Sequence, residues 1–463
     1  MHKENRFKVW NNFKLKYPNI NLNGKCILVK GTPTTYRDDT DHEELTRQES
    51  YFHYLFGVKE PDFYGAIDLS NGNSYLFAPK LPPAFAVWMG EIKNNQYWKD
   101  HYKVEDCFYV EDIEKTLKSL NCDTVCVISG VNTDSGLAHQ GAPFEGISNF
   151  KVDKDLLFPV IQNARVVKSD KELDVMRYVA AESAKAHSEI MRIVKPGMSE
   201  FQLESHFRHL IYCNSGCRNV SYTCICGSGP NGAILHYGHA GAPNDKLIKE
   251  GEMLMFDMGG EYHCYGADIS RSFPVSGRFT EEQREVYSSV LASQQAVMDA
   301  MKAGVSWPDM HRLANRVICE QLKKYNFLKG DIEDMMANYV GALFMPHGLG
   351  HLLGLDTHDV GGYPEGTSRS TEPGLKSLRY GGLLEKNMVI TVEPGIYFIR
   401  AVLEPAFLNP QVNIFLNEEK IRKFLDFGGI RIEDDVIVLE NGIENMSRGC
   451  PRSIEDIEAL MNS

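Results

Sequence analysis

The chain has 463 residues, of which 43% are hydrophobic and 24% are charged, and its formal net charge at pH 7 is −13. This length is typical of two or three domains. The negative charge argues against nucleic acid as a partner, and no apolar run approaches the length of a membrane span. No apolar segment follows the charged residues 1–8, so we expect no secretory signal.

The cysteines favour a cytoplasmic protein. There are eleven of them, scattered along the chain, and without a secretory signal they are expected to be reduced thiols. The densest group lacks the paired CxxC spacing of a zinc ribbon, so no structural zinc site is expected at Cys213, Cys217, Cys224 and Cys226.

Residues 1–164 predict an α/β domain. Strands are expected at residues 26–29, 63–69, 73–77 and 124–128, with a helix at 110–120. This alternation favours a mixed sheet covered by helices. The aromatic and polar segment 47–53 fits a helix on the surface of the domain.

Residues 165–463 predict a second domain of the α+β class. Its first helix begins at a capping box, in which Ser169 is followed by Glu172. Thr280 is expected to be the N-cap of another helix, with Gln283 as its return partner. Further elements are expected to be helices at 281–301 and 310–325, and strands at 222–225, 388–392 and 430–438.

Residues 252–271 predict a hairpin that carries two aspartates. Asp257 ends the first apolar run, and Asp268 is expected in the second strand. A buried carboxylate needs a partner, and a metal ion held by both aspartates would be a sufficient one. The hairpin alone leaves a second interpretation equally open, in which both are ordinary turn and edge residues.

Three later segments add residues that commonly ligate metals. Glu393 ends an apolar strand just before Pro394, and Glu433 interrupts the strand at 430–438. Each glutamate stands in a strand that would be more stable without it, which indicates a site. Segment 346–359 contributes the histidines His347, His351 and His358.

The ordered series of these residues resembles the pita-bread metallopeptidases. The series is Asp257, Asp268, the HGxGH segment 347–351, the VEPG segment 392–395 and the RIEDD segment 431–435. Within that family, the chain is similar to the Xaa-Pro dipeptidases (prolidases). This similarity covers essentially the whole chain, through segments 47–50, 130–136, 222–229, 235–245 and 358–366.

The resemblance implies a site for two divalent metal ions. Asp257 and Asp268 would hold one ion, His351 and Glu393 the other, and Asp268 and Glu433 would bridge. The metal charge would keep the clustered carboxylates ionised, and a hydroxide between the ions would be the nucleophile. An oxygen-rich set with one imidazole suits Mn²⁺, while Zn²⁺ and Co²⁺ stay open.

The resemblance also implies roles for other residues. His236, His347 and His358 would stabilise the oxyanion, and Glu393 would carry a proton to the leaving proline nitrogen. Arg379 would pair with the substrate carboxylate. The remaining substrate-binding residues implied are Tyr222, Ile225, Arg431 and Trp88, the last from a loop that caps the partner subunit's site. From the sequence alone, Trp88 could equally be a core residue.

The expected function is hydrolysis of the imidopeptide bond in dipeptides that end in proline, by a cytoplasmic homodimer. The amide nitrogen of a bond that precedes proline carries no hydrogen. Enzymes that bind their substrate through that N–H therefore cannot cleave the bond, whereas an enzyme whose metal polarises the carbonyl can cleave it. Two alternatives are an aminopeptidase acting on longer Xaa-Pro peptides and a binding protein of the same fold without catalysis. The presence of the whole ligand series argues against the second.

Overall fold

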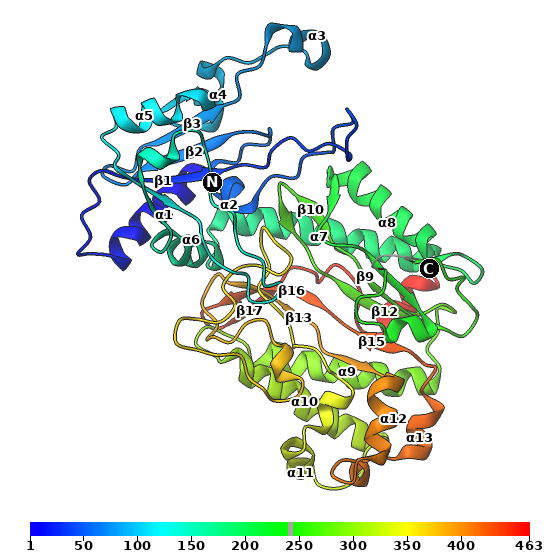
Figure 1. Cartoon of the computed structure of the whole chain (residues 1–463). Coiled ribbons are helices and arrows are strands. Elements are labelled where there is room, and N and C mark those ends of the chain that lie inside the picture. Colours follow the sequence, from blue (N-terminus) through cyan, green and yellow to red (C-terminus); the bar gives the residue numbers. More distant parts are fainter. Residues whose placement is uncertain (239–243) are drawn as a thin grey trace. The chain divides into compact units, whose positions relative to one another are not determined.

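The computed structural model describes residues 1–238 and 244–463, which form two compact units, Met1–Arg165 and Val166–Ser463 (Figure 1). Part of the predicted motif at 235–245 therefore lies outside the described residues. Within the described ranges, no helix combines the length and apolar character needed to cross a membrane.

The first unit is built on one six-stranded mixed sheet with the strand order β4-β3-β2-β1-β5-β6. Pairs β1–β2 and β2–β3 are antiparallel, whereas β3–β4, β1–β5 and β5–β6 are parallel. The strands are β1 (Lys25–Lys30), β2 (Tyr64–Asp68), β3 (Ser74–Ala78), β4 (Asp106–Tyr109), β5 (Thr124–Val127) and β6 (Lys151–Asp153).

The helices of this unit are α1 (His2–Lys16), α2 (Ser50–Phe56), α3 (Ala86–Met89), α4 (Asn95–Tyr102), α5 (Ile113–Ser119) and α6 (Leu157–Val166). Helix α2 contacts β1 and β2, and α4 contacts β3 and β4. The interpretation of segment 47–53 as a surface helix was wrong. Every residue of α2 is buried, because the helix packs against strands β1 and β2 and its aromatic side chains become part of the core.

In the second unit, the strands lie between two helix pairs (Figure 1). Helix α7 (Asp170–Ile193) packs on α8 (Glu200–Ser215), and α9 (Glu281–Ala300) packs on α10 (Trp307–Lys324). The predicted capping boxes at Ser169 and Thr280 are both present. The shorter helices are α11 (Ile332–Ala337), α12 (Arg400–Leu408), α13 (Glu418–Lys423) and α14 (Ile454–Met461).

The described strands of this unit form four small sheets, ordered β11-β10-β7, β12-β9-β8, β13-β16-β17 and β14-β15. Their bounds are β7 (Asn219–Val220), β8 (Ile225–Ser228), β9 (Met253–Asp257), β10 (Gly260–Tyr262), β11 (Tyr265–Gly266), β12 (Ser270–Pro274), β13 (Val389–Val392), β14 (Gly395–Tyr397), β15 (Gly429–Arg431), β16 (Asp434–Leu439) and β17 (Gly442–Asn445).

Three sequence-based strand predictions need correction. Asp268 lies before β12 and not within a strand, because the chain makes a separate small hairpin, β10–β11, between β9 and β12. Glu433 falls in a break between β15 and β16, which belong to different sheets. Tyr222 precedes β8, which begins only at Ile225. Both acidic residues therefore lie outside the strand ladders. Their backbone N–H groups donate elsewhere, that of Glu433 to the Ser270 carbonyl oxygen and that of Asp268 to the Asp435 carboxylate.

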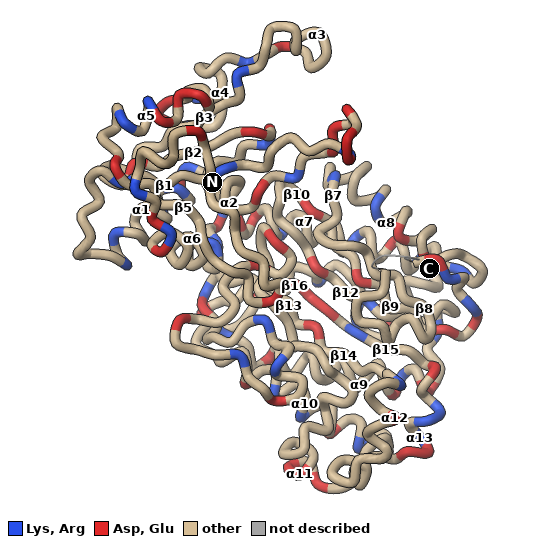
Figure 2. The backbone as a smooth tube through the Cα atoms, viewed as in Figure 1, with Lys and Arg blue, Asp and Glu red and all other residues tan. Residues whose placement is uncertain are grey.

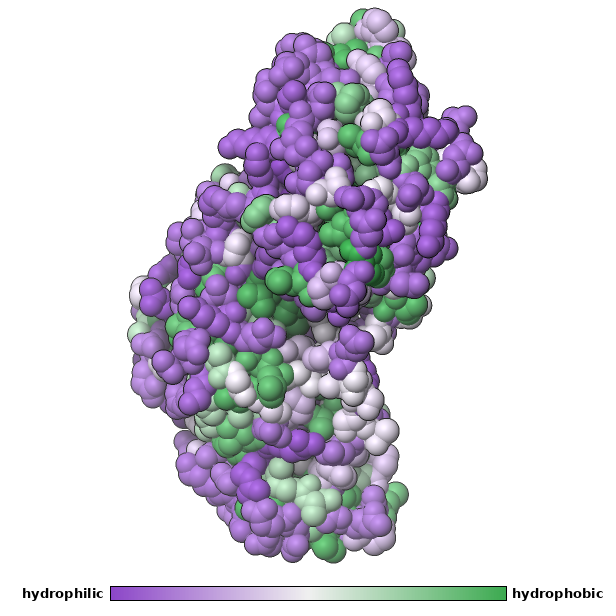
Figure 3. Space-filling view, turned by 90° about the vertical axis from the view of Figure 1, so that its left-hand side faces the viewer, coloured by the Kyte–Doolittle hydropathy of each residue, from purple (hydrophilic) through white to green (hydrophobic). Residues whose placement is uncertain are grey.

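Lys and Arg alternate with Asp and Glu along most of each unit, and acidic residues gather in the exposed segment 38–44 (Figure 2). Hydrophilic residues make up much of the face drawn in Figure 3, with smaller hydrophobic patches between them. Both features agree with the composition.

Candidate active site

One cavity in the second unit gathers nearly all the residues predicted from the sequence. Its volume is about 520 Å³, and it is lined by Tyr222, Ile225, His236, Asp257, Asp268, His347, His351, His358, Arg379, Glu393, Arg431 and Glu433. Trp88 is the exception. It lies in α3 of the first unit, and 84% of it is exposed.

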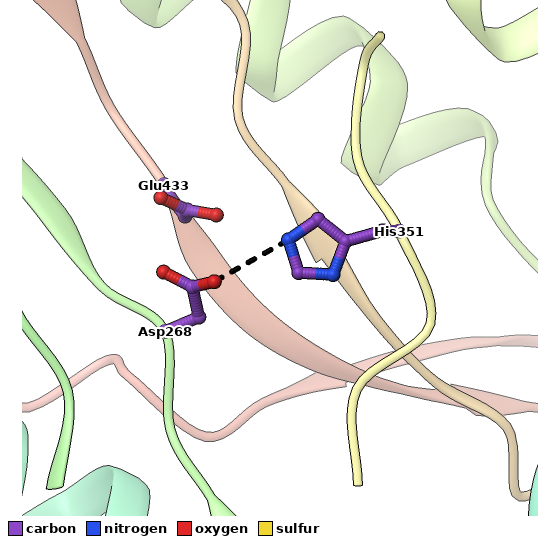
Figure 4. A group of neighbouring side chains, drawn as sticks. All are labelled: Asp268, His351 and Glu433. Carbon is purple, nitrogen blue, oxygen red and sulfur yellow. Dashed lines mark ion pairs between the residues drawn. The ribbon is translucent and has the colours of Figure 1, made fainter. Parts of the chain in front are cut away.

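Asp268, His351 and Glu433 form the tightest group of potential ligands in the described chain. Each offers a ligand atom, and these atoms all lie within 4.8 Å of one another. The His351 Nε2 atom is 3.3 Å from Asp268 Oδ2, and the three side chains point toward one another from separate segments (Figure 4). All three residues are buried.

The hydrogen bonds of His351 suit a metal ligand. Its Nδ1 lies 3.1 Å from the Leu352 carbonyl oxygen, so Nδ1 carries the proton and donates it there. Nε2 faces the carboxylates of Asp268 and Glu393, and in the neutral imidazole it is the nitrogen with the lone pair that can bind a metal. A backbone partner on the other ring nitrogen is the usual device that orients metal-bound histidines.

Asp257 lies at the edge of this group and is held by neutral and cationic partners. Its carboxylate accepts hydrogen bonds from the Tyr222 hydroxyl and from the Arg431 guanidinium. Arg431 also donates to Ser270 Oγ at 2.8 Å, and its Nε is 3.8 Å from Glu433. Arg431 therefore links Asp257, at the end of strand β9, to Glu433 inside the cavity.

Glu393 directly follows strand β13, as predicted. Its Oε1 lies 3.6 Å from His351 Nε2 and accepts a hydrogen bond of 3.3 Å from Thr391 Oγ1. Its Oε2 lies 3.7 Å from His347 Nδ1. The carboxylate thus stands between the ligand group and a second histidine, where it can hold and move a proton.

Burial and mutual repulsion both disfavour the ionised form of Asp257, Glu393 and Glu433 and raise the pKa values of these carboxylates. Burial and the nearby Asp268 raise the pKa of Asp257 to about 7, although Arg431 opposes the shift. Burial, Asp268 and Glu393 raise the pKa of Glu433 well above its usual value. Bound cations would relieve this repulsion and return the group to its ionised form, so the donor set fits divalent metal ions.

The histidines outside the ligand group differ in their surroundings. Burial and the charge of Arg431 lower the pKa of His347 to about 3, so His347 is neutral at pH 7. His358 packs edge-on against His351, with ring centroids 4.5 Å apart, and is open to the cavity. His236 lines the cavity beside Leu235.

Arg379 brings a positive charge to the same cavity. It follows the single-turn helix at Leu375–Ser377, and both Ser377 and Arg379 line the wall. A guanidinium at this position can pair with a substrate carboxylate through two hydrogen bonds.

Several supporting residues escaped the sequence-based prediction. The Tyr397 hydroxyl accepts a hydrogen bond of 2.9 Å from Arg431 and lies 3.1 Å from His347 Nε2. The buried Asp435 accepts hydrogen bonds from the backbone N–H of Asp268. Thr391 and Tyr397 flank the VEPG segment, so their proximity to Glu393 in sequence was the available signal.

The fold and the cluster of ligands together define a metallopeptidase of the pita-bread class. The sequence matches metallopeptidase family M24 over residues 174–440 and the aminopeptidase P N-terminal domain over residues 2–126. The chain belongs to metallopeptidase family M24. The predicted fold class and the expectation of a hydrolytic enzyme are therefore confirmed.

Similar proteins extend over the whole chain. A Homo sapiens protein named Xaa-Pro dipeptidase is 52% identical over 439 residues, which cover 95% of this chain and 89% of the relative. The Mus musculus Xaa-Pro dipeptidase is 50% identical over 437 residues, covering 94% and 88%. The structure of aminopeptidase PepP from Pseudomonas aeruginosa has a TM-score of 0.78 at 30% identity, and covers 99% of this chain and 98% of its own.

Proposed function

We propose that this enzyme is an Xaa-Pro dipeptidase, which hydrolyses the imidopeptide bond of dipeptides with C-terminal proline at a binuclear metal site. The observation that carries the proposal is the convergence of Asp268, His351 and Glu433, with Asp257 and Glu393, in the cavity that also holds Arg379. The high identity to relatives named Xaa-Pro dipeptidase supports it.

We assign one ion to Asp257 and Asp268 and the other to His351 and Glu393, with Asp268 and Glu433 shared. Hard oxygen ligands and a single imidazole favour Mn²⁺. Divalent ions held there would supply Lewis-acid polarisation of the scissile carbonyl and water activation at neutral pH. We further propose a homodimer in the cytoplasm.

The residues of this chain would then divide the remaining work. Glu393 takes a proton from water and passes it to the proline nitrogen, which must leave as an amine. His236, His347 and His358 are proposed to stabilise the oxyanion. His347 is neutral and its Nδ1 donates to the Gly348 carbonyl oxygen at 2.7 Å, so it has to exchange that bond for one to the substrate. Tyr222 and Ile225 line the cavity beside the reacting groups.

Arg379 accounts for the selection of dipeptides. A dipeptide that ends in proline carries its carboxylate on the residue next to the one that bears the amino group, and Arg379 can bind that carboxylate bidentately. A longer peptide has an uncharged amide at the same point and so offers Arg379 no carboxylate to bind. The proposal therefore predicts a preference for dipeptides, in contrast with an aminopeptidase.

The decisive assay is hydrolysis of Gly-Pro by the purified protein. Chelation is expected to abolish release of proline, and addition of Mn²⁺ to restore it. Full activity after rigorous metal removal would contradict the metal-dependent function. Comparing Gly-Pro with Gly-Pro-Gly separates the alternatives, because faster cleavage of the tripeptide would favour the aminopeptidase.

Two variants test the assignment of the ligands. Asp268→Asn is expected to reduce the content of both metals, because we assign Asp268 to both ions, whereas Asp257→Asn should reduce chiefly one. Elemental analysis after dialysis against Mn²⁺ measures the metal-to-protein ratio. Retention of both ions by Asp268→Asn would show that the bridging role is wrongly assigned.

A further inference from the structure

A fully buried ion pair lies beside the substrate cavity. Lys168 Nζ is 3.0 Å from Asp359 Oδ2, and the side chains of both residues are 1% exposed. Lys168 Nζ also donates to the Val166 carbonyl oxygen at 3.3 Å. The partners are 191 positions apart in sequence, so this pair joins two distant segments at one buried point.

Lys168 belongs to the short connection between α6 and α7, and its own backbone is fixed. Its N–H donates to the Asn387 carbonyl oxygen at 2.9 Å, just before strand β13. The next residue, Ser169, caps α7. The ammonium group therefore projects from an anchored position rather than from a loose linker.

Asp359 directly follows His358, whose imidazole reaches into the cavity. The backbone around this aspartate is also constrained, because its N–H donates to the Leu352 carbonyl oxygen at 2.8 Å. A Cβ on Gly361 would lie 2.5 Å from a methyl group of Val166. The segment that carries His358 thus packs against the end of α6, two residues before Lys168.

The ion pair between Lys168 and Asp359 fits because residue 354 is a glycine, with no side chain to occupy the same space. A Cβ on Gly354 would lie 2.2 Å from Asp359 Oδ2 and 3.1 Å from Lys168 Cε. Burying two charges is costly unless the geometry is good, and replacing them with apolar residues is often neutral for stability. A buried ion pair directly next to a cavity residue therefore points to a role in the site.

We propose that Lys168 and Asp359 are positioning residues, which hold the His358 imidazole at its place in the substrate cavity. The inference rests on the proposed dipeptidase function. The carboxylate fixes the backbone next to His358, and the lysine fixes the carboxylate. Loss of either charge would let the segment 358–361 shift, and small displacements of oriented groups reduce catalysis steeply.

The test is a double-mutant cycle with His358. Lys168→Met is expected to lower kcat/KM for Gly-Pro about 10-fold, but less than about 2-fold when His358→Ala is already present. Equal losses in both backgrounds would overturn the proposal, because a general structural defect acts independently of His358. Lys168→Arg keeps the charge and should stay within about 3-fold of the unaltered enzyme.

Asp359→Asn provides a second variant of nearly unchanged shape, in case Lys168→Met does not fold. The matched control is Lys420→Met, which removes a 2.7 Å ion pair with Glu285 away from the cavity and should leave kcat/KM unchanged. Hydrolysis of Gly-Pro by the unaltered enzyme tests the dipeptidase function separately.

An NMR measurement, which needs no enzymatic turnover, tests the position of the His358 ring directly. In protein carrying ¹³C-labelled histidine, the His358 ring signal is assigned by its loss in His358→Ala. That signal is expected to move in Lys168→Met and Asp359→Asn and to stay in place in Lys420→Met. An unmoved His358 signal in both variants of the pair would overturn the positioning role, whatever the enzyme hydrolyses.

Discussion

At the scale of single residues, Arg379 and Glu393 are expected to separate binding from turnover. Arg379→Ala removes the proposed partner of the substrate carboxylate and should raise KM for Gly-Pro about 30- to 100-fold, with a smaller effect on kcat. Glu393→Ala should lower kcat by at least about 100-fold, because it removes the proposed proton carrier. Steady-state kinetics measure both.

The control for Arg379 is Arg312→Ala. Arg312 pairs with Asp309 and Glu372 and does not line the cavity, so its loss should leave KM unchanged. Equal effects of the Arg379 and Glu393 substitutions on substrate affinity would contradict the assigned roles.

The buried carboxylates make the stability of the metal-free protein depend on pH. Burial raises the pKa of Asp257 to about 7, above its value in the unfolded chain. The folded form therefore holds a proton that the unfolded form releases, and the resulting stabilisation disappears as the pH rises through about 7. We expect the chelated protein to melt at a lower temperature at pH 8 than at about pH 5.5.

Thermal denaturation of the chelated protein at both pH values tests whether the melting temperature falls as the pH rises. Asp257→Asn, which cannot ionise, should reduce the difference, and saturating Mn²⁺ should raise the melting temperature most at the higher pH. A melting temperature that rises with pH for the chelated protein, unchanged in Asp257→Asn, would show that other groups dominate.

The glutamates could be singled out as candidate ligands from the sequence, because a carboxylate that ends or interrupts an apolar strand contradicts its local context. Glu393 follows an apolar strand, and such a placement is readable from neighbouring residues. The contacts of Tyr397 and Asp435 were not readable, because they join segments far apart in sequence. Only the folded chain brings the backbone N–H of Asp268 to the carboxylate of Asp435.

At the scale of elements, helix starts were predicted well because capping is local. The boxes at Ser169 and Thr280 need only residues within one turn. Strand ends were predicted less well, because a strand ends where its hydrogen bonds to neighbouring strands end, and those neighbours are distant in sequence. Strand β9 pairs with both β8 and β12, and the small hairpin β10–β11 joins another sheet through β7. No local pattern separates these sheets.

The approach of segment 347–351 to strand β13 gives a prediction at this scale. A Cβ on Gly350 would lie 2.0 Å from the Thr391 carbonyl oxygen, where His351 N–H also donates to Thr391 Oγ1 at 3.1 Å. Gly350→Ala should push the segment off the strand and destabilise the protein by about 1–3 kcal/mol. Because His351 moves with the segment, Mn²⁺ affinity should fall as well.

Urea denaturation and metal titration measure these two effects. Gly449→Ala is the control, since an added Cβ there meets nothing nearer than 3.9 Å. A Gly350→Ala protein with unaltered stability and Mn²⁺ affinity would show that this contact can relax without disturbing His351.

At the scale of the whole molecule, the exposed apolar residues of α3 need an explanation. Val87, Trp88 and Met89 are all exposed in this four-residue helix. Large apolar side chains gathered on a surface commonly mark an interface, and tryptophan is enriched at interface centres. We therefore predict a homodimer in which Trp88 closes the partner subunit's cavity, and sedimentation should show a dimer.

Mixed dimers test whether Trp88 acts across subunits. Trp88→Ala alone should raise KM for Gly-Pro because the cavity loses its cover, and Glu393→Ala alone should be inactive. In a dimer that pairs these two variants, the intact cavity belongs to the Trp88→Ala subunit and the intact tryptophan to the other. If Trp88 caps the partner, co-expressed mixed dimers regain near-normal KM at that one cavity. If KM stays as high as in Trp88→Ala homodimers, Trp88 acts within its own subunit or not at all.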